Sequence, residues 1–200
     1  MKTGKTVKVL LTAATAAGML AGCGSKTDTD TFRFASELDI QGMDSTVVDD
    51  GMSFNAIHAI TDGLTAVNEK GKTAPAIAKS WDVSDDGKTY TFHLRDAKWT
   101  NGDKVTANDF VYSWRKIIKD AGNYAYMLGS GGASVKNADA LMELGANATD
   151  EQMATLGVTA KDDKTLVVEL ENKVPYFTDL MAFPCYFPQN EKFVEKCGKN

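Results

Sequence analysis

The stretch YTFHLRDAKWTNGDKVTANDFVYSW, residues 90–114, decides the fold. Its first residues alternate polar and apolar side chains, which is the period of a strand with one buried face. Thr106 then offers an N-cap hydroxyl and Asp109 an acid three residues later, and apolar residues follow at helical spacing, namely Phe110, Val111, Trp114, Ile117 and Ile118. The stretch therefore predicts a strand followed by a capped amphipathic helix.

Two β-hairpins are predicted on either side of this helix. The first joins residues 81–84 to residues 89–94 through a turn that contains Gly87. The second joins residues 158–160 to residues 165–170. Strands mixed with helices place the chain in the α/β class, as a mixed α+β protein.

Weaker patterns predict the remaining elements. Residues 31–35 alternate as a strand does, and they start the mature fold. Apolar residues at helical spacing predict a helix from about Ser53 to Thr61, which Gly63 ends. A second capping pattern begins at Thr149. The glycine-rich residues 129–133 lack the order of a phosphate-binding loop, so we expect a flexible surface loop.

The N-terminus has the composition of a targeting segment. Three lysines precede an uncharged run of about a dozen residues, which is too short to span a bilayer. The run ends in Leu20-Ala21-Gly22-Cys23, which resembles the lipobox of bacterial lipoproteins. Residues 1–22 are therefore predicted to be a signal peptide, Cys23 the lipidated residue, and residues 23–30 a flexible tether. The alternative is an ordinary secretory signal with a chance cysteine.

Charge and cysteine usage narrow the function classes. Removing residues 1–22 takes away three of 22 basic side chains and leaves 27 acidic ones, so the mature net charge is −8 and a nucleic-acid partner is disfavoured. Cys185 and Cys197 would face an oxidising exterior, but spacing alone cannot pair them. No CxxC motif accompanies them, and His58 and His93 lie far away in the sequence, so no metal site is expected. No other cofactor is expected either.

Residues 90–102 and 105–114 together closely resemble the signature stretch of family 5 extracellular solute-binding proteins. Further matching motifs occur in the right order, namely Asp62-Gly63-Leu64, residues 75–81, Leu156-Gly157-Val158, Asp162-Asp163 and Val174-Pro175-Tyr176-Phe177. The resemblance extends from about Phe32 to Lys196. Within the family, the chain is most similar to oligopeptide-binding lipoproteins.

The resemblance implies a periplasmic-binding-protein-like type II fold of two lobes, with a small domain appended to the first lobe. Residues 31–55 would begin lobe I, residues 56–172 would form the small α+β domain, and residues 173–200 would return to lobe I. Relatives are longer, so the chain is expected to be an N-terminal fragment that contains only the start of lobe I and the small domain.

The implied function is the substrate-binding component of an ABC importer. It would capture extracellular oligopeptides and deliver them to a permease and ATPase complex, from the extracellular or periplasmic face of the cell membrane, where a lipid anchor holds it. The alternatives are a surface sensor of peptide signals, or a binder of a dipeptide, nickel chelate or sugar.

The resemblance assigns peptide contact to Asp49, Asp50, Gly51 and Met52, called here the candidate segment. The alternative is that Asp49-Asp50-Gly51 is only an exposed turn before the helix. The strongest anchor for the ligand's amino group would lie outside this chain.

An enzyme is not expected. His93 lies in a predicted strand, and neither it nor His58 has a nucleophile at a recognisable spacing. Asp109 is explained by helix capping and Asp103 by a turn beside Gly102. The large aromatic residues of the signature are expected to be buried scaffold, each contributing roughly 1.5–3 kcal/mol, and they are Trp81, Tyr90, Phe92, Trp99, Phe110 and Trp114.

Overall fold

The computed structural model describes residues 35, 36 and 38–197. Contacts group the residues from Leu38 onward into one unit. Cys23, the signal peptide, the tether and nearly all of the predicted strand at residues 31–35 lie outside the described residues. Within the described part of the chain, no helix combines the length and apolar character that crossing a bilayer requires.

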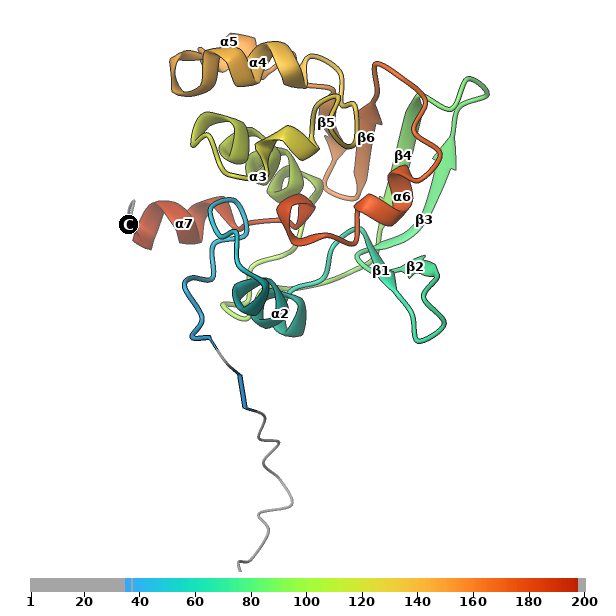
Figure 1. The fold of residues 1–200 in the computed structure, drawn as a ribbon. Helices are drawn as coiled ribbons and strands as arrows, with labels where there is room; N and C mark the ends of the chain where they lie inside the picture. The colour runs from blue at the N-terminus through green and yellow to red at the C-terminus, as the bar shows by residue number, and fades with distance from the viewer. Residues whose placement is uncertain (1–34, 37, 198–200) are drawn as a thin grey trace, which may run out of the picture. The chain divides into compact units, whose positions relative to one another are not determined.

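A four-stranded antiparallel sheet is built from the two predicted hairpins (Figure 1). The first hairpin is β3 (Ala78–Val83) with β4 (Thr89–Leu94), and the second is β5 (Val158–Asp162) with β6 (Thr165–Glu169). The strand order is β3-β4-β6-β5, so β4 and β6 join the hairpins in the middle, with Phe92 opposite Leu166. Both predicted hairpins are confirmed.

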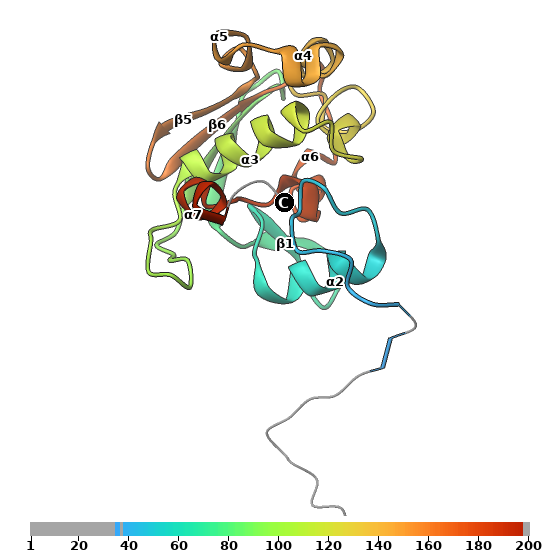
Figure 2. The ribbon, with the colours of Figure 1, turned by 90° about the vertical axis from the view of Figure 1, so that its left-hand side faces the viewer.

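Helix α3 (Ala107–Lys119) covers the inner face of this sheet and packs against β5 and β6 (Figure 2). The predicted capping box is present, since the Thr106 N–H donates to Asp109 Oδ2 at 2.7 Å. The buried residues of α3 repeat at three- and four-residue steps, as the sequence predicts. The helix is thus held at its start by a local cap and along its length by the sheet.

Helix α2 (Gly51–Ile60) is the predicted helix near residues 53–61, beginning two residues earlier. It is followed by a two-stranded sheet of β1 (Thr65–Val67) and β2 (Thr73–Pro75), which the sequence patterns did not predict. The prediction that Gly63 ends the helix was wrong, because Thr61 is the C-cap. A Cβ at Gly63 would lie 2.4 Å from the carbonyl oxygen of Met181, so glycine there permits a close backbone approach.

Short helices connect α3 to the second hairpin. They are η2 (Ala125–Met127), α4 (Ala138–Leu144), η3 (Gly145–Asn147) and α5 (Asp150–Met153). The capping box predicted at Thr149 is present, but α5 has only four residues. The C-terminal part of the described chain contains α6 (Phe177–Leu180), η4 (Pro184–Tyr186) and α7 (Glu191–Cys197).

The structure corrects the prediction of a flexible surface loop at the glycine-rich residues 129–133. They form a tightly hydrogen-bonded turn rather than a flexible surface loop, and Gly129, Gly132 and Ala133 are buried. A Cβ at Gly132 would lie 2.2 Å from the carbonyl oxygen of Met127. The glycines therefore allow this turn to pack directly on η2.

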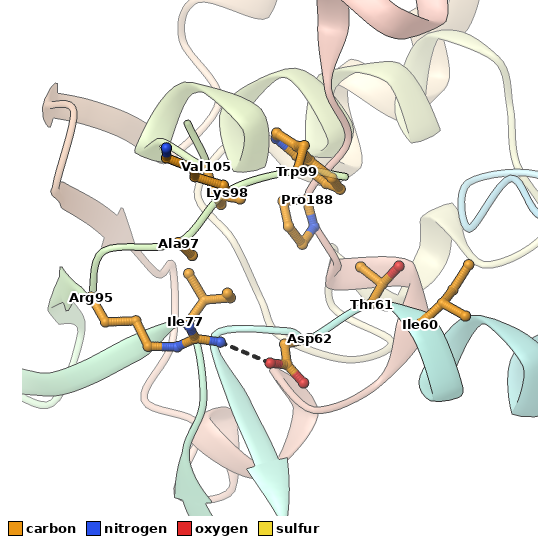
Figure 3. Close-up of a pocket in the computed structure, with 10 residues that line it drawn as sticks. All are labelled: Ile60, Thr61, Asp62, Ile77, Arg95, Ala97, Lys98, Trp99, Val105 and Pro188. Atoms are coloured by element: carbon orange, nitrogen blue, oxygen red, sulfur yellow. Dashed lines mark hydrogen bonds and ion pairs between the residues drawn. The ribbon is translucent and has the colours of Figure 1, made fainter. Parts of the chain in front are cut away.

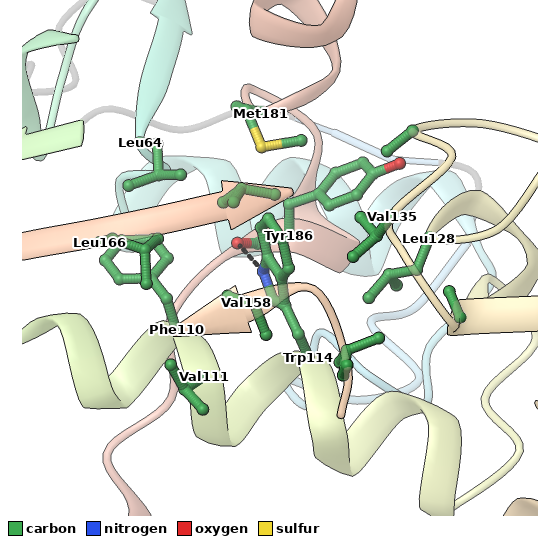
Figure 4. Packing of buried hydrophobic residues seen from close by; sticks show 14 of the residues in the cluster. Leu64, Phe110, Val111, Trp114, Leu128, Val135, Val158, Leu166, Met181 and Tyr186 are labelled. Atoms are coloured by element: carbon green, nitrogen blue, oxygen red, sulfur yellow. Dashed lines mark hydrogen bonds between the residues drawn. The ribbon is translucent and has the colours of Figure 1, made fainter. Parts of the chain in front are cut away.

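The core lies between the sheet and α3 and extends to the C-terminal segment (Figure 4). Trp114 and Tyr186 are fully buried and meet edge to face with ring centroids 5.6 Å apart. Four of the six signature aromatic residues are buried as predicted. Trp81 and Trp99 are only partly buried, at the edge of the core. The division into residues 31–55, 56–172 and 173–200 stays a prediction.

Candidate functional site

The candidate segment forms the entry into α2. Asp50 is the N-cap of this helix, with an extended backbone, and its Oδ1 accepts a hydrogen bond from the Ser53 N–H at 2.8 Å. Hydrogen bonds from the Ser53 side chain and backbone hold the pKa of Asp50 below its ordinary value. Asp50 therefore has a structural role as the N-cap of α2.

The other members of the candidate segment face outward to different degrees. Asp49 is exposed, and its Oδ2 accepts a hydrogen bond from Asn123 Nδ2 at 2.6 Å. Gly51 is exposed, and a Cβ built on it would meet no atom within 4 Å. Met52 is partly exposed. Asp49 and Gly51 thus leave a carboxylate and an uncovered stretch of backbone open to a ligand.

Residues 41–48 lead into the candidate segment and are folded back on α2. Ser53 Oγ accepts hydrogen bonds from the backbone N–H groups of Gln41 and Gly42, at 3.0 and 3.2 Å. The backbone N–H groups of Val47 and Val48 both donate to the carbonyl oxygen of Asp44 at 3.1 Å. The approach to the segment is therefore a hydrogen-bonded turn.

A cluster of polar side chains fastens this turn to α3. We call Asp44, Thr46, Lys116, Asp120 and Gln189 the anchor cluster. Lys116 Nζ lies 2.8 Å from Asp44 Oδ2 and 3.0 Å from Asp120 Oδ2, and Gln189 Nε2 donates to Asp44 Oδ1 at 2.6 Å. Burial acts to raise the pKa of Asp44, but hydrogen bonds from Lys116, Thr46 and Gln189 outweigh it and lower that pKa.

Aromatic rings place the loop after α3 beside α2. Phe54 contacts Tyr124 edge to face at 5.2 Å between ring centroids, and Phe183 at 5.1 Å. Tyr126 stacks on Tyr124 at 5.9 Å and keeps 51% of its surface exposed. Sequence analysis missed Asn123 and these tyrosines as neighbours of the candidate segment, because no local pattern brings residues 49 and 123 together.

An open pocket of about 170 Å³ lies at the other end of α2 (Figure 3). Arg95 points across it and forms an ion pair with Asp62, with the guanidinium nitrogen 2.9 Å from Asp62 Oδ2. Its apolar lining includes Ile77, Trp99 and Val105. A second pocket, of about 310 Å³, lies beside α4. No residue of the candidate segment lines either pocket.

His93, His58 and Asp103, which were considered for catalysis, make contacts that explain them as structural residues. His93 Nε2 lies 2.7 Å from Asp82 Oδ2 on the neighbouring strand. His58 stands edge-on to the Phe187 ring, and burial lowers its pKa. Asp103 accepts hydrogen bonds from the side-chain amides of Asn101 and Asn190, each at 3.0 Å. None of these residues contacts a nucleophile in the interactions described.

Cysteine and metal chemistry give no further site among residues 35, 36 and 38–197. Cys185 is buried, Cys197 is exposed, and both are free thiols. Burial raises the pKa of the Cys185 thiol far above its ordinary value, so the thiol stays protonated at neutral pH. Across these described residues, no group of three or more His, Cys, Asp or Glu side chains could hold a metal ion.

Comparison with known proteins decides the family. A sequence model of the family described as bacterial extracellular solute-binding proteins, family 5 (middle), matches residues 72–199. The chain belongs to this family. Its members are solute-binding proteins rather than enzymes, and the resemblance seen in the signature motifs is confirmed.

Relatives within family 5 share both sequence and fold. The chain is 39% identical to a dipeptide-binding protein of Lactococcus lactis over 203 residues. A solved oligopeptide ABC transporter substrate-binding domain of Bacillus anthracis is 41% identical, with a TM-score of 0.76 over 83% of this chain. The structure of Listeria monocytogenes OppA bound to peptide is 40% identical, with a TM-score of 0.70 over 78% of this chain. The predicted fold class is thereby confirmed.

The match covers only part of each relative. The chain spans 35% of the Lactococcus protein, 31% of the Bacillus anthracis chain and 30% of the Listeria chain. The chain therefore corresponds to about a third of the length of a family member.

Proposed function

We propose that this chain is part of the substrate-binding component of an ABC importer, which captures extracellular oligopeptides and passes them to a membrane permease with its ATPase. The observation that carries this proposal is the 40% identity to a solved family member whose structure was determined with peptide bound. The outward-facing carboxylate at Asp49 and the uncovered backbone at Gly51 are suited to contact with a peptide main chain.

The candidate segment supplies complementary groups for such a ligand. The Asp49 carboxylate is an acceptor for peptide N–H groups or for an ammonium group. Gly51 has no side chain, so an extended peptide can approach the helix entry closely. Met52 offers a flexible apolar surface for varied side chains. Asp50 supports these contacts by fixing the first turn of α2.

A lipid anchor at Cys23 would keep this binding site at the outer face of the membrane. The motif Leu20-Ala21-Gly22-Cys23 supports the anchor. Metabolic labelling with a clickable palmitate analogue tests it. The wild-type chain is expected to incorporate label and to fractionate with the cell membrane, whereas Cys23→Ala should do neither. Equal labelling of both proteins would reject Cys23 as the lipidated residue.

Calorimetric titration tests ligand class. A pool of dipeptides and a pool of four- to six-residue peptides would be titrated into this chain and into the whole product of its reading frame. Heat with the longer peptides alone supports the proposed ligand, and heat with dipeptides alone assigns a dipeptide binder. Absence of heat with both pools in both proteins would reject a peptide ligand, and nickel chelates and sugars would be titrated next.

A further inference from the structure

The anchor cluster contains a largely buried cation, Lys116. The Lys116 side chain is 14% exposed, although it carries a full charge. Its Nζ has three partners, which are Asp44 Oδ2 at 2.8 Å, Thr46 Oγ1 at 2.6 Å and Asp120 Oδ2 at 3.0 Å. An ammonium group has three donors, so Lys116 uses all of them within the cluster.

The partners of Lys116 belong to two different parts of the chain. Asp120 lies four residues after Lys116, at the C-terminal end of α3, whereas Asp44 and Thr46 lie in the turn before the candidate segment. Asp44 Oδ1 accepts the Thr46 N–H at 2.9 Å and the Thr46 hydroxyl at 2.7 Å. The lysine therefore holds a turn whose own geometry depends on the same carboxylate.

A second set of contacts continues the attachment toward the candidate segment. Thr46 is buried, and a Cβ at Gly122 would lie 2.0 Å from its carbonyl oxygen, so the turn touches the loop that follows α3. Asn123, the next residue, donates to Asp49 at 2.6 Å. Lys116 thus holds the chain before Val47 and Val48, and Asn123 holds it after them, at Asp49.

From this arrangement we propose that Lys116 is a positioning residue for peptide binding: it fixes the backbone that presents Asp49 and Gly51 without itself touching the ligand. This role rests on the proposed function. Removing the ammonium group leaves the Asp44 carboxylate and the Thr46 hydroxyl without their shared donor, and a half-buried carboxylate without its cation is unfavourable. Movement of Asp44 toward water would relieve this cost, and it would displace the candidate segment that follows the turn.

Hydrogen exchange read residue by residue by NMR tests the positioning role on the chain itself. In Lys116→Met, exchange of the Thr46, Val48 and Ser53 amides is expected to accelerate by at least about tenfold, while amides of β4 and β6 keep their protection. Lys116→Arg retains the charge and should restore most of the protection. Unchanged exchange at these three amides, or equal acceleration throughout the sheet, would overturn the role.

Lys119→Met is the matched control. Lys119 lies on the same helix and also forms an ion pair, with Asp150 at 2.6 Å, but it does not contact the turn. It should leave exchange at Thr46, Val48 and Ser53 unaltered. If Lys119→Met accelerates these amides as much as Lys116→Met, general loss of charge on α3 is responsible and the positioning role is wrong.

Peptide titration then separates the two proposals. In the whole product of the reading frame, Lys116→Met is expected to weaken peptide binding by about tenfold and Lys119→Met to leave it unchanged. If the wild-type protein binds no peptide, the proposed function fails and exchange alone decides whether Lys116 holds the segment. If Lys116→Met loosens the segment but binds peptide with wild-type affinity, Lys116 does not position the site.

Discussion

Trp114 donates a hydrogen bond from its indole Nε1 to the carbonyl oxygen of Tyr186, 3.0 Å away and 72 residues later in the sequence. Beside it, Ser113 Oγ donates to the carbonyl oxygen of Phe187 at 2.7 Å. All four residues are buried. Two neighbouring side chains of α3 thus satisfy two successive carbonyl groups of the returning chain, and they fix its path across the core.

Substituting Trp114 by Phe should therefore destabilise the chain markedly. The change leaves the Tyr186 carbonyl oxygen without a donor and opens a space in the core, so the free energy of unfolding is expected to fall by about 2–4 kcal/mol. Urea denaturation followed by circular dichroism measures it. Trp81→Phe, at the partly buried edge of the sheet, serves as control and should cost less than about 1 kcal/mol. Equal losses in both variants would contradict the importance of the buried indole.

Two partly buried carboxylates should give opposite dependences of stability on pH. Because the folded pKa of Asp44 is lowered, its stabilisation is present above the unfolded pKa near 3.8 and is lost as pH falls through the folded value. Burial raises the folded pKa of Asp109, so its contribution is greatest below the unfolded pKa and is lost as pH rises through the folded value.

Denaturation at a series of pH values between about 2 and 7 checks these signs. Relative to wild type, Asp44→Asn should lose stability most at the upper end of the range, and the difference should shrink toward acid. Asp109→Asn should show the reverse trend, with its relative stability improving as pH rises. The same trend in both variants would refute the opposite environments assigned to the two carboxylates.

Substituting Gly63 by Ala should be costly although the change adds one methyl group. The new Cβ would lie 2.4 Å from the Met181 carbonyl oxygen and 2.6 Å from the Phe187 ring, so the backbone must shift, and the expected loss is about 1–3 kcal/mol. Gly51→Ala is the matched control for stability, because its Cβ would meet nothing within 4 Å. Thermal unfolding should show a lower midpoint for Gly63→Ala alone; an unaltered midpoint would mean that the contact relaxes freely.

Substitution of the two neighbouring acids of the candidate segment should have different effects, on stability at Asp50 and on peptide binding at Asp49. Asp50→Ala removes the N-cap of α2 and is expected to reduce the free energy of unfolding by about 1 kcal/mol. Asp49→Ala removes only an exposed hydrogen bond and should change stability by less than about 0.5 kcal/mol. Titration with peptide should nevertheless show weaker binding for Asp49→Ala. Unchanged affinity in that variant would remove Asp49 from the proposed site.

Local features of the fold could be predicted from the sequence because their signals lie within a few residues. The hairpin turn at Gly87 and the capping box of Thr106 with Asp109 each involve neighbours in the chain, and both are present. Glycines were harder to interpret. Gly63 and Gly132 serve close approaches to distant backbone atoms, which no local pattern reveals.

The candidate site could be predicted from the sequence only in part, for the same reason. Asp50 caps α2 through the Ser53 N–H, which lies only three residues away in the sequence. Lys116, by contrast, reaches Asp44 across 72 positions, and Asn123 reaches Asp49 across 74. A single sequence gives no indication that these pairs meet. Peptide contact by the segment itself stays a prediction.

The strand order also bears on how the protein reaches its folded state. β4 pairs with β3 across a short turn, whereas its other edge pairs with β6, and 70 residues separate Leu94 from Thr165. Until those residues arrive, the hairpin presents an unpaired edge on which a second unfolded chain can form hydrogen bonds. Aggregation during refolding should therefore begin at β4, and it should rise steeply with protein concentration.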